Sequence, residues 1–537
     1  MGHRGAPRAR VIAPPAWRCV PLAIVLIAGA LSAALPAPPA RALEFSIDRF
    51  VVDGPNPIGQ PAADQALAPF LGRLEGLDGL QRAVQALQEA FNERGFTFYR
   101  VVLPPQTLDG GVVHLEVVAM RLAEVSVSGN QRFNAENVKR SLPFIRPGEV
   151  PHPYEMSNAL DFANLHIAKR VNVKLAENKN KQALNATITV EEQRPWKLFA
   201  GINNIGSPDT GRNRITFGAV HGNLLGRDHL ASLNYTTSPE NADDVSQFSA
   251  SYEIPLYWQR ATLSAFYSSS DVDVGEVGDF SVSGAGNFWG FFYTQHLTKR
   301  GGYAHSWSLG MEGRLFENDV EFAGQQIGVD VRSVPLTASY AGNYEGEGWN
   351  ATFGISYSRN LGIWDRNNDL VYALTRFGAD AGWDAVRFNG LYQRKLPADL
   401  TGRIIIDGQW SDDALIPGEQ WGLGGWQSVR GLDERALTGD SGVRASFELY
   451  SPAELLPAGL RLLGFFDVGV WDREEPLPGE TASDSVASVG LGARWAWNNA
   501  LSLSLDYGKT IVASRGVAPG SQDIDDTKLH FNVFYTY

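Results

Sequence analysis

The sequence predicts two small α+β modules followed by a transmembrane antiparallel β-barrel of about sixteen strands. Three observations lead to this prediction. The chain ends on an alternating strand with an aromatic last residue, and repeated strands with one apolar face fill the region after Trp196. Before residue 195, two segments repeat one β-α-α-β-β order.

The last nine residues alternate between an apolar and a polar face. His530, Asn532 and Thr536 share the polar face, with Phe534 as the one exception, and the apolar face holds Leu529, Phe531, Val533, Tyr535 and Tyr537. Lipid covers the outer face of a membrane barrel while the lumen stays polar, so the pattern suits a closing barrel strand. The alternative is the closing edge strand of a soluble sandwich.

Residues 1–42 have the layout of a secretory signal peptide. An apolar run over 20–35 and a small-x-small cleavage site at 40–42 follow the arginines Arg4, Arg8, Arg10 and Arg18. Cleavage removes the only cysteine, Cys19, and five arginines, so the net charge falls from −13 to about −18. An acidic, cysteine-free secreted chain argues against nucleic-acid binding and against a disulfide scaffold.

The two modules are predicted over residues 43–120 and 121–194. In the first, the pattern predicts a strand over 45–52, helices over 60–71 and 80–94, and strands over 97–103 and 112–120. In the second, it predicts a strand over 122–128, helices over 134–142 and 154–169, and strands over 171–175 and 184–190. Neither module contains a catalytic constellation, and His114 is interpreted as a surface residue.

The barrel is predicted over residues 195–537. Leu501, Leu503, Leu505 and Tyr507 alternate with Ser502, Ser504 and Asp506, a pattern in which charge on the hidden face of a soluble core would be costly. No stretch after the signal peptide reaches 18 consecutive apolar residues, while 14 Trp, 17 Tyr, 27 Phe and 56 Gly suit a barrel with interfacial girdles. Composition alone also allows a large secreted β-sandwich enzyme.

A long glycine-rich connection over residues 416–442 is the most specific feature of the barrel region. Long loops without secondary structure are usually functional or disordered, and this one keeps apolar residues that should pack on something: Trp421, Leu423, Trp426 and Val429. Arg430 on this loop and Asp467 on the lumen face of a nearby strand form a plausible partly buried ion pair. The alternative is an exposed loop arginine and a solvated lumen aspartate.

Two motifs resemble the POTRA-plus-barrel outer-membrane transporters. Val429-Arg430-Gly431-Leu432 resembles the signature of their inward-folded loop, with Leu432 in place of the usual aromatic, and Phe465-Phe466-Asp467-Val468-Gly469 resembles the wall motif whose aspartate meets the loop arginine. Segments 204–211, 222–228 and 251–256 are similar to the first barrel strands of the two-partner secretion transporters, the haemolysin and filamentous-haemagglutinin exporters. Two tandem modules match that family's periplasmic count.

The resemblance implies export of an unfolded, β-rich partner protein across an outer membrane. The periplasmic modules would bind the partner by strand addition, the barrel would conduct it, and Arg430, Gly431 and Asp467 would lock the inward loop, supported by Val429, Phe465 and Gly469. Outer-membrane lipid and the barrel-assembly machinery, acting through the C-terminal strand, are the other expected partners. The alternatives are a barrel insertase and a passive solute channel.

One departure from the family concerns the N-terminal helix that commonly plugs the barrel of relatives. Strand-like Phe45 follows the predicted cleavage site almost immediately, so the sequence leaves no room for such a helix and the inward loop is expected to be the sole obstruction.

No enzyme, metal site or cofactor is predicted. Segment 439–442 reads Gly-Asp-Ser-Gly, as around the nucleophile of a serine protease, but no further glycine follows it and no partner histidine is placed nearby. It is therefore interpreted as a turn. Glycines 422, 424 and 425 lack the strand–turn–helix setting of a phosphate loop, and no cluster has metal-ligand spacing.

Overall fold

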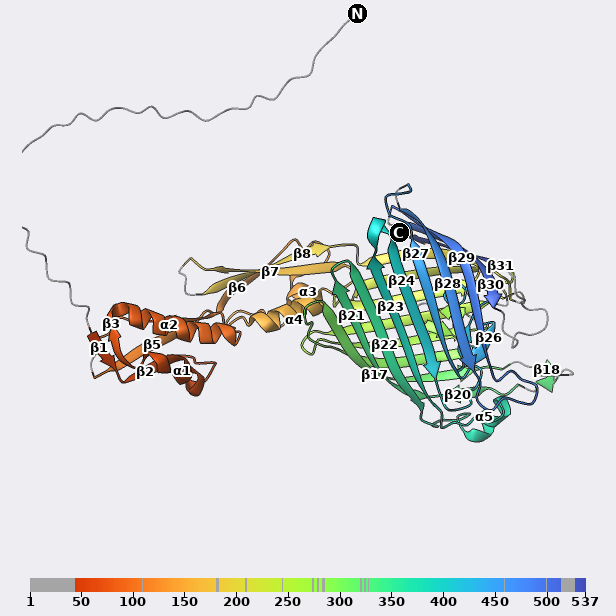
Figure 1. Ribbon diagram of the computed structural model, residues 1–537, viewed down its shortest axis with the longest axis horizontal. Coiled ribbons are helices and arrows are strands. Elements are labelled where there is room, and N and C mark those ends of the chain that lie inside the picture. The colour runs from red at the N-terminus through yellow and green to blue at the C-terminus, as the bar shows by residue number, and fades with distance from the viewer. Residues whose placement is uncertain are drawn as a thin grey trace, which may run out of the picture.

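The computed structural model describes residues 44–537 apart from 109, 180–182, 208–209, 244, 273–274, 278–279, 283–284, 319–320, 323–324, 327, 458, 499 and 513–526. The predicted signal peptide and part of the 204–211 motif lie outside the described residues. Two α+β modules form an arm that extends from a closed barrel, with the N-terminal module farthest from it (Figure 1). The predicted fold class is confirmed.

Module 1 is a three-stranded sheet with two helices packed on it. Strand β2 runs parallel to β5, and β4 pairs antiparallel with β5. The helix residues Leu80, Leu87 and Phe91 are buried in the module core, as their spacing predicts. The elements are β1 (Glu44–Ile47), β2 (Arg49–Asp53), α1 (Gln60–Leu67), the 3-10 turn η1 (Ala68–Phe70), β3 (Gly72–Glu75), α2 (Gly76–Glu93), β4 (Tyr99–Val102) and β5 (Val112–Ala119).

The single strand predicted over 45–52 is wrong. The segment forms two strands, and β1 pairs with β3 in a sheet of its own. The break falls at Asp48, whose backbone N–H donates to the carbonyl of Gly111 at 2.7 Å. This bond draws the following residues away from β3 and into register with β5.

Module 2 repeats the sheet order of module 1. Strand β6 runs parallel to β8, and β7 pairs antiparallel with β8. The helix predicted over 154–169 is too long, because the side chain of Asn164 exchanges hydrogen bonds with the backbone of Val171 at 3.0 and 2.7 Å and turns the chain into β7. The elements are β6 (Leu122–Ser128), α3 (Ala135–Ser141), α4 (Pro153–Ala163), β7 (Lys169–Glu177) and β8 (Leu184–Glu192).

Sixteen antiparallel strands close the barrel, and β31 pairs with β9 to complete it. Segments β20 and β21 both pair with β17 and act as one strand interrupted at Val334. The strands are β9 (Trp196–Asn203), β10 (Arg214–Leu224), β11 (His229–Thr237), β12 (Ser246–Leu256), β13 (Ala261–Ser270), β16 (Gly286–His296), β17 (Tyr303–Phe316), β20 (Val331–Ser333) with β21 (Pro335–Gly346), β22 (Trp349–Asn360), β23 (Asp384–Lys395), β24 (Thr401–Trp410), β27 (Ser441–Tyr450), β28 (Leu460–Asp472), β29 (Ser483–Trp497), β30 (Leu501–Val512) and β31 (Thr527–Thr536).

The connections between barrel strands differ at the two ends. We call the end that carries the arm the module end and the opposite end the loop end (Figure 1). The module-end turns are short, with the 3-10 turn η2 (Pro397–Asp399) in one of them. The loop-end connections contain the helix α5 (Asp369–Thr375) and three hairpins: β14 (Gly275–Val277) with β15 (Phe280–Val282), β18 (Glu321–Phe322) with β19 (Gln325–Gln326), and β25 (Trp421–Leu423) with β26 (Leu437–Gly439).

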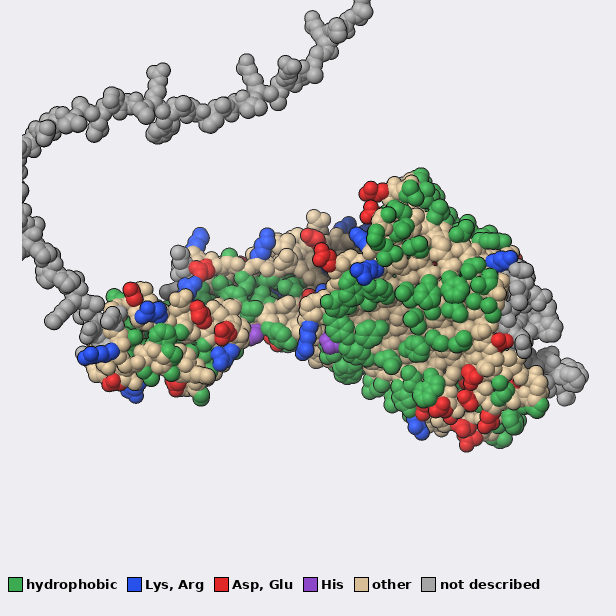
Figure 2. Space-filling view, in the orientation of Figure 1, with side chains coloured by type: hydrophobic (Ala, Val, Ile, Leu, Met, Phe, Trp, Pro, Cys, Tyr) green, Lys and Arg blue, Asp and Glu red, His purple; other side chains and the backbone are tan. Residues whose placement is uncertain are grey.

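The two faces of the wall follow the alternation read from the sequence. Tyr507 is 51% exposed on the outside, while the neighbouring Asp506 is fully buried on the inside. Hydrophobic side chains cover much of the barrel wall, and acidic side chains gather near the loop end (Figure 2). Among the described helices, none is both long and apolar enough to span a bilayer.

Aromatic pairs ring the module end of the barrel. Trp196 and Tyr537 lie 5.8 Å apart between ring centroids, next to the point where β9 and β31 close the wall. Further pairs continue this girdle, Tyr344 with Trp349 at 4.7 Å and Trp495 with Trp497 at 5.9 Å. Such belts mark the level of lipid headgroups.

Candidate functional site: the inward loop and the barrel base

The connection between β24 and β27, residues 411–440, folds into the barrel. The sequence gives no sign of its secondary structure, but it contains the β25–β26 hairpin. The expected packing is confirmed for Leu423, Val429 and Trp421, but not for Trp426, whose indole faces Asp506. A buried cluster joins loop and wall: Leu423, Val429, Leu432, Leu437, Trp471 and Val486. Leu432, the residue at which the loop motif departs from the signature it resembles, is part of this cluster.

The structure brings Arg430 of the loop and Asp467 of β28 together. The guanidinium donates from Nε to Oδ2 at 2.8 Å and from Nη2 to Oδ1 at 2.7 Å, and the backbone N–H of Arg430 also donates to Oδ2, at 3.1 Å. Arg430 is 3% exposed and Asp467 1%, so neither fits the alternative of an exposed arginine and a solvated aspartate. A planar, two-pronged contact of this kind fixes orientation as well as distance.

Further wall residues complete the surroundings of Arg430. Nη1 donates to Glu448 Oε1 at 2.9 Å, and Nη2 donates to the hydroxyl of Ser446, also at 2.9 Å. Asp506 on β30 lies 3.7 Å from Nη1 and also accepts from the indole N–H of Trp426, at 2.9 Å. One buried cation therefore faces three carboxylates, which makes it the centre of the network.

The supporting residues named from the sequence occupy defined places. The ring of Phe465 lies under the guanidinium, with its centroid 3.5 Å from Cζ of Arg430. A Cβ at Gly469 would come within 2.6 Å of Leu423, so this glycine lets the loop approach β28. Val429 is fully buried in the apolar cluster. Gly431 has a φ of +104°, which glycine adopts without strain.

Two contact residues of the loop tip were missed from the sequence. The backbone N–H of Gly431 donates to Nε2 of His530 on β31, at 3.2 Å. Gly508 on β30 has no side chain where the loop backbone passes, and a Cβ there would lie 2.7 Å from the nitrogen of Gly431. The alternation of the terminal strand places His530 on its polar, inward face. Its contact with Gly431 could not be predicted, because only closure of the barrel brings β31 to the loop tip.

The stem of the loop is attached at a separate place. Glu419 accepts from Arg314 of β17 at 2.5 Å and from Arg387 of β23 at 3.3 Å. Asp440 accepts from Nη2 of Arg376 at 2.6 Å and from the backbone N–H of Leu415 at 2.9 Å. Segment 439–442, interpreted as a turn, contains the bend between β26 and β27, and Asp440 in this bend is a buried acceptor that closes the loop.

A second buried ion pair joins module 2 to the barrel. Nζ of Lys169 on β7 lies 2.5 Å from Oδ2 of Asp228, in the turn between β10 and β11, and both side chains are almost fully buried. The hydroxyl of Tyr257 donates to the same Oδ2 at 2.8 Å, and the amide of Asn137 donates to the carbonyl of Gly226 at 2.9 Å. His166 Nε2 lies 2.5 Å from the carbonyl oxygen of Gly222.

Burial shapes the ionisation of this junction. It lowers the pKa of Lys169, and the nearby Asp228 carboxylate opposes the shift. It also lowers the pKa of His166, again against the attraction of Asp228. Since Nε2 of His166 faces a carbonyl oxygen and Nδ1 accepts from the N–H of Ala168 at 3.1 Å, the neutral ring satisfies both contacts.

The sequence model of the haemolysin secretion/activation protein ShlB/FhaC/HecB family matches residues 185–495, which is more than half of the chain. The chain belongs to this family. A model of the ShlB-type POTRA domain matches residues 45–119, which covers the first module.

Characterised relatives align along most of the transporter. The outer membrane transporter CdiB of Escherichia coli O6:K15:H31 (strain 536 / UPEC) is 23% identical over 83% of this chain and 76% of its own length. The heme/hemopexin transporter protein HuxB of Haemophilus influenzae (strain 86-028NP) is 20% identical over 82% of this chain and 78% of its own.

Solved structures share the fold of the transporter. CdiB from Escherichia coli superposes with a TM-score of 0.68 at 19% identity, covering 94% of this chain and 93% of that one. CdiB from Acinetobacter baumannii gives 0.65 at 18% identity, covering 92% and 90%. The protein is an outer-membrane transporter whose POTRA modules lie in the periplasm, so the module end of the barrel is periplasmic.

Proposed function

We propose that this transporter exports an unfolded partner protein by two-partner secretion, with the modules recruiting the partner and the barrel conducting it. The observation that carries the proposal is an inward loop held across the lumen by buried ion pairs, which are specific and reversible contacts. The names of relatives support it, since HpmB of Proteus mirabilis is a hemolysin transporter protein, 22% identical over 68% of this chain.

Open strand edges on the arm support the recruiting role. Within the described residues, β4 pairs with β5 alone and β7 pairs with β8 alone, so each has one free edge. Arg100 on β4 and Glu177 on β7 lie 2.6 Å apart, which brings the two edges next to each other along the arm. An extended segment of the partner could add to either edge through main-chain hydrogen bonds.

The role we assign to the inward loop is that of a lock. Arg430, Gly431 and Asp467 would hold the tip closed, with Val429, Phe465 and Gly469 in support, until the arriving partner displaces it.

We infer no catalytic role for the protein. The Ser441 hydroxyl donates to the carbonyl of Ser411 and so has a structural role, joining the two ends of the inward loop. The barrel insertase remains the second candidate, but nothing in the described residues favours it over export.

We also propose the domain limits 1–42, 43–120, 121–194 and 195–537 for leader, two modules and barrel. The expected partners beyond the exported protein are outer-membrane lipid and the assembly machinery that would read the terminal strand β31.

Deletion of residues 45–120 tests the recruiting role. The full-length transporter and the deletion variant are co-expressed with the cognate partner, and the partner is measured in the medium. We expect a fall of roughly tenfold or more, because one of the two recruiting edges is lost. Heat-modifiable migration and pore conductance of the variant serve as the control for an intact barrel. Unchanged secretion would contradict the recruiting role.

A further inference from the structure

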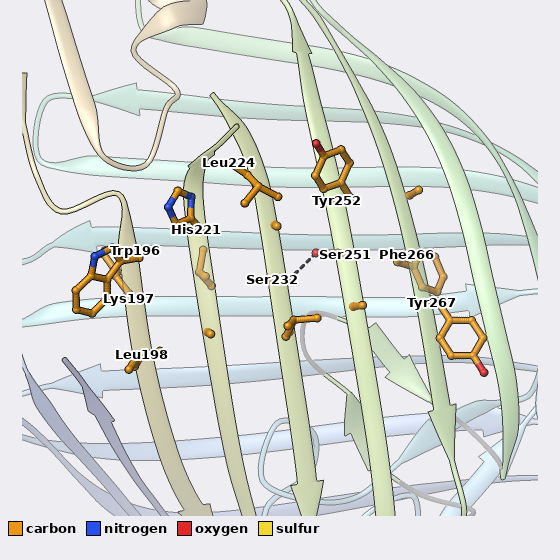
Figure 3. Close-up of a pocket in the computed structure, with 16 residues that line it drawn as sticks. Trp196, Lys197, Leu198, His221, Leu224, Ser232, Ser251, Tyr252, Phe266 and Tyr267 are labelled. Atoms are coloured by element: carbon orange, nitrogen blue, oxygen red, sulfur yellow. Dashed lines mark hydrogen bonds between the residues drawn. The ribbon is translucent and has the colours of Figure 1, made fainter. Parts of the chain in front are cut away.

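The outer wall of the barrel carries an apolar hollow over β9 to β13. It measures about 700 Å³ and lies beside the periplasmic aromatic girdle, with Trp196, His221 and Tyr252 toward the module end and Tyr267 farther along (Figure 3). Its floor is shaped by small outward residues set between large ones. In the strand register, Ala231 faces Tyr252, Ala250 faces Tyr267, and Ala250 also faces Leu233.

The hollow opens toward lipid. Leu198, Leu233 and Tyr267, which border it, are 49%, 52% and 45% exposed, whereas the inward Ser249 of the same wall is 1% exposed. The exposed lining side chains are almost all apolar, so the hollow offers water few partners and suits a hydrocarbon chain. It is continuous with the lipid-facing band of the barrel.

Three arginines surround the periplasmic rim of the hollow. Leu224 lines the hollow and Arg227 follows three residues later, exposed in the β10–β11 turn. The bond from Asn137 to Gly226 brings α3 against this turn, and Arg140, one helical turn after Asn137, lies on the same side of α3. On the opposite side, the guanidinium carbon of Arg194 lies 5.5 Å from the ring centroid of Trp196.

The ion pairs found among the described residues include none of Arg140, Arg194 and Arg227, whereas many arginines inside the barrel have a carboxylate partner. Unpaired cations directly below an apolar hollow match a molecule with an anionic head and an acyl tail.

We propose that the hollow and its rim form a binding site for an anionic phospholipid of the periplasmic leaflet. One acyl chain fills the space above Ala231 and Ala250, and the phosphate contacts Arg227 and Arg140, with Arg194 at the other edge. Because Arg140 belongs to module 2 and Arg227 to the barrel, a bound headgroup bridges the two. The lipid thereby supports the arm at a point separate from the Lys169–Asp228 pair.

Native mass spectrometry of the full chain, purified in detergent and titrated with phosphatidylglycerol or phosphatidylcholine, tests the site. We expect the first phosphatidylglycerol to be retained at least fivefold better than phosphatidylcholine. The double variants Arg140→Gln/Arg227→Gln and Ala231→Leu/Ala250→Leu should each reduce that retention about fivefold, by loss of charge and by filling of the hollow. The matched controls are Arg82→Gln, an exposed arginine on α2, and Ala445→Leu, an outward alanine on β27.

Three results would overturn the proposal. Equal retention in variants and controls would show surrounding lipid only. Competition by inorganic phosphate as effective as that of the lipid would show a free-phosphate site. Loss with the arginine variant but not with the alanine variant would show a headgroup contact without an acyl groove. The arginine variant changes exposed side chains alone, so its result stands even if the leucine variant loses heat-modifiable migration. Lipid retention and its competition by phosphate are both measured on the purified protein, so the test does not depend on secretion.

Discussion

The inward loop and the arm are each attached to the barrel by a buried ion pair, but the two attachments are built differently. Arg430 serves three carboxylates with a planar guanidinium that is hydrogen-bonded along three nitrogens. Lys169 serves one carboxylate, and Asp228 has a second donor in Tyr257. Removal of Arg430 therefore breaks the contacts of the loop to three wall carboxylates, of which Glu448 and Asp506 keep Arg403 and Arg494. Removal of Lys169 breaks one such contact and leaves Asp228 with the hydroxyl of Tyr257.

The comparison predicts the largest effect for Arg430→Ala. Breaking a buried pair costs about 3–5 kcal/mol, and Asp467 loses its cation here. Glu448 and Asp506 lose their contact to the loop, although each keeps an arginine of the wall, Arg403 and Arg494. We expect secretion of the partner to fall roughly tenfold or more and pore conductance to rise as the loop loosens. Asp467→Ala should act in the same direction, and the double variant should be far less than additive. Arg430→Lys should also impair export, because an ammonium group cannot reproduce the planar contact.

A suitable control for the loop series is Arg359→Ala, since that arginine is well exposed and its distance to Asp384 is 3.9 Å. It should leave both secretion and conductance unchanged. Normal secretion by both Arg430→Ala and Asp467→Ala would remove the loop from the export mechanism.

At the junction, Lys169→Met should weaken the attachment of module 2 by about 3 kcal/mol, the lower end for a broken buried pair. Spin labels on introduced cysteines in module 2 and the barrel would report a broader distance distribution. Adding Asp228→Asn should restore most of the attachment, because no charge is then left over and Tyr257 keeps an oxygen acceptor. The second substitution should recover more of the lost attachment at the junction than it does in the Arg430→Ala/Asp467→Ala double variant. An equal recovery in the two double variants would refute the contrast between the two attachments.

A smaller effect is expected for Gly508→Ala, which tests the close approach of the loop tip to β30. The new Cβ would lie 2.7 Å from backbone atoms of Arg430 and Gly431, an overlap that costs about 1–3 kcal/mol. Conductance should rise moderately. Gly464→Ala on β28 is the matched control, since the nearest atom to its added Cβ is 4.0 Å away. Identical conductance in both variants would show that the loop does not depend on this contact.

The smallest effect is a pH dependence of the junction. Burial lowers the folded-state pKa of His166 below its ordinary value of 6.5, so the unfolded state binds a proton first as the pH falls. Stability supplied by the neutral ring is present above pH 6.5 and is lost below it, by less than about 1.4 kcal/mol per pH unit. The spin-label distance should broaden between pH 7.5 and 5.5, and His166→Gln should remove most of that change. A spin-label distance distribution that does not change with pH would contradict the neutral state assigned to the His166 ring.

Alternation within single strands was readable from the sequence, while contacts between distant strands were not. The parities of Asp467 and Asp506 follow from two-residue periodicity, and the fold class follows from the same signal. Glu448, Asp506 and His530 come from β27, β30 and β31, and only closure of the barrel brings them to one loop residue.

The junction escaped sequence analysis for a different reason. The helix predicted over 154–169 ends at Lys169, since nothing in the pattern indicates that Asn164 turns the chain into a strand. Asp228 stands 59 residues later, in a turn that looked like an ordinary hairpin. A buried lysine is detectable only when its neighbours from another domain are known.

The two attachments of the inward loop have a mechanical consequence for the barrel itself. Glu419 ties the stem to β17 and β23, and Arg430 and Gly431 tie the tip to β27, β28 and β31. The loop therefore acts as a cross-brace that resists flattening of the cylinder. Release of the tip would soften the cross-section as well as clear it, so an open barrel should be both wider in bore and more compliant under lateral pressure from the bilayer.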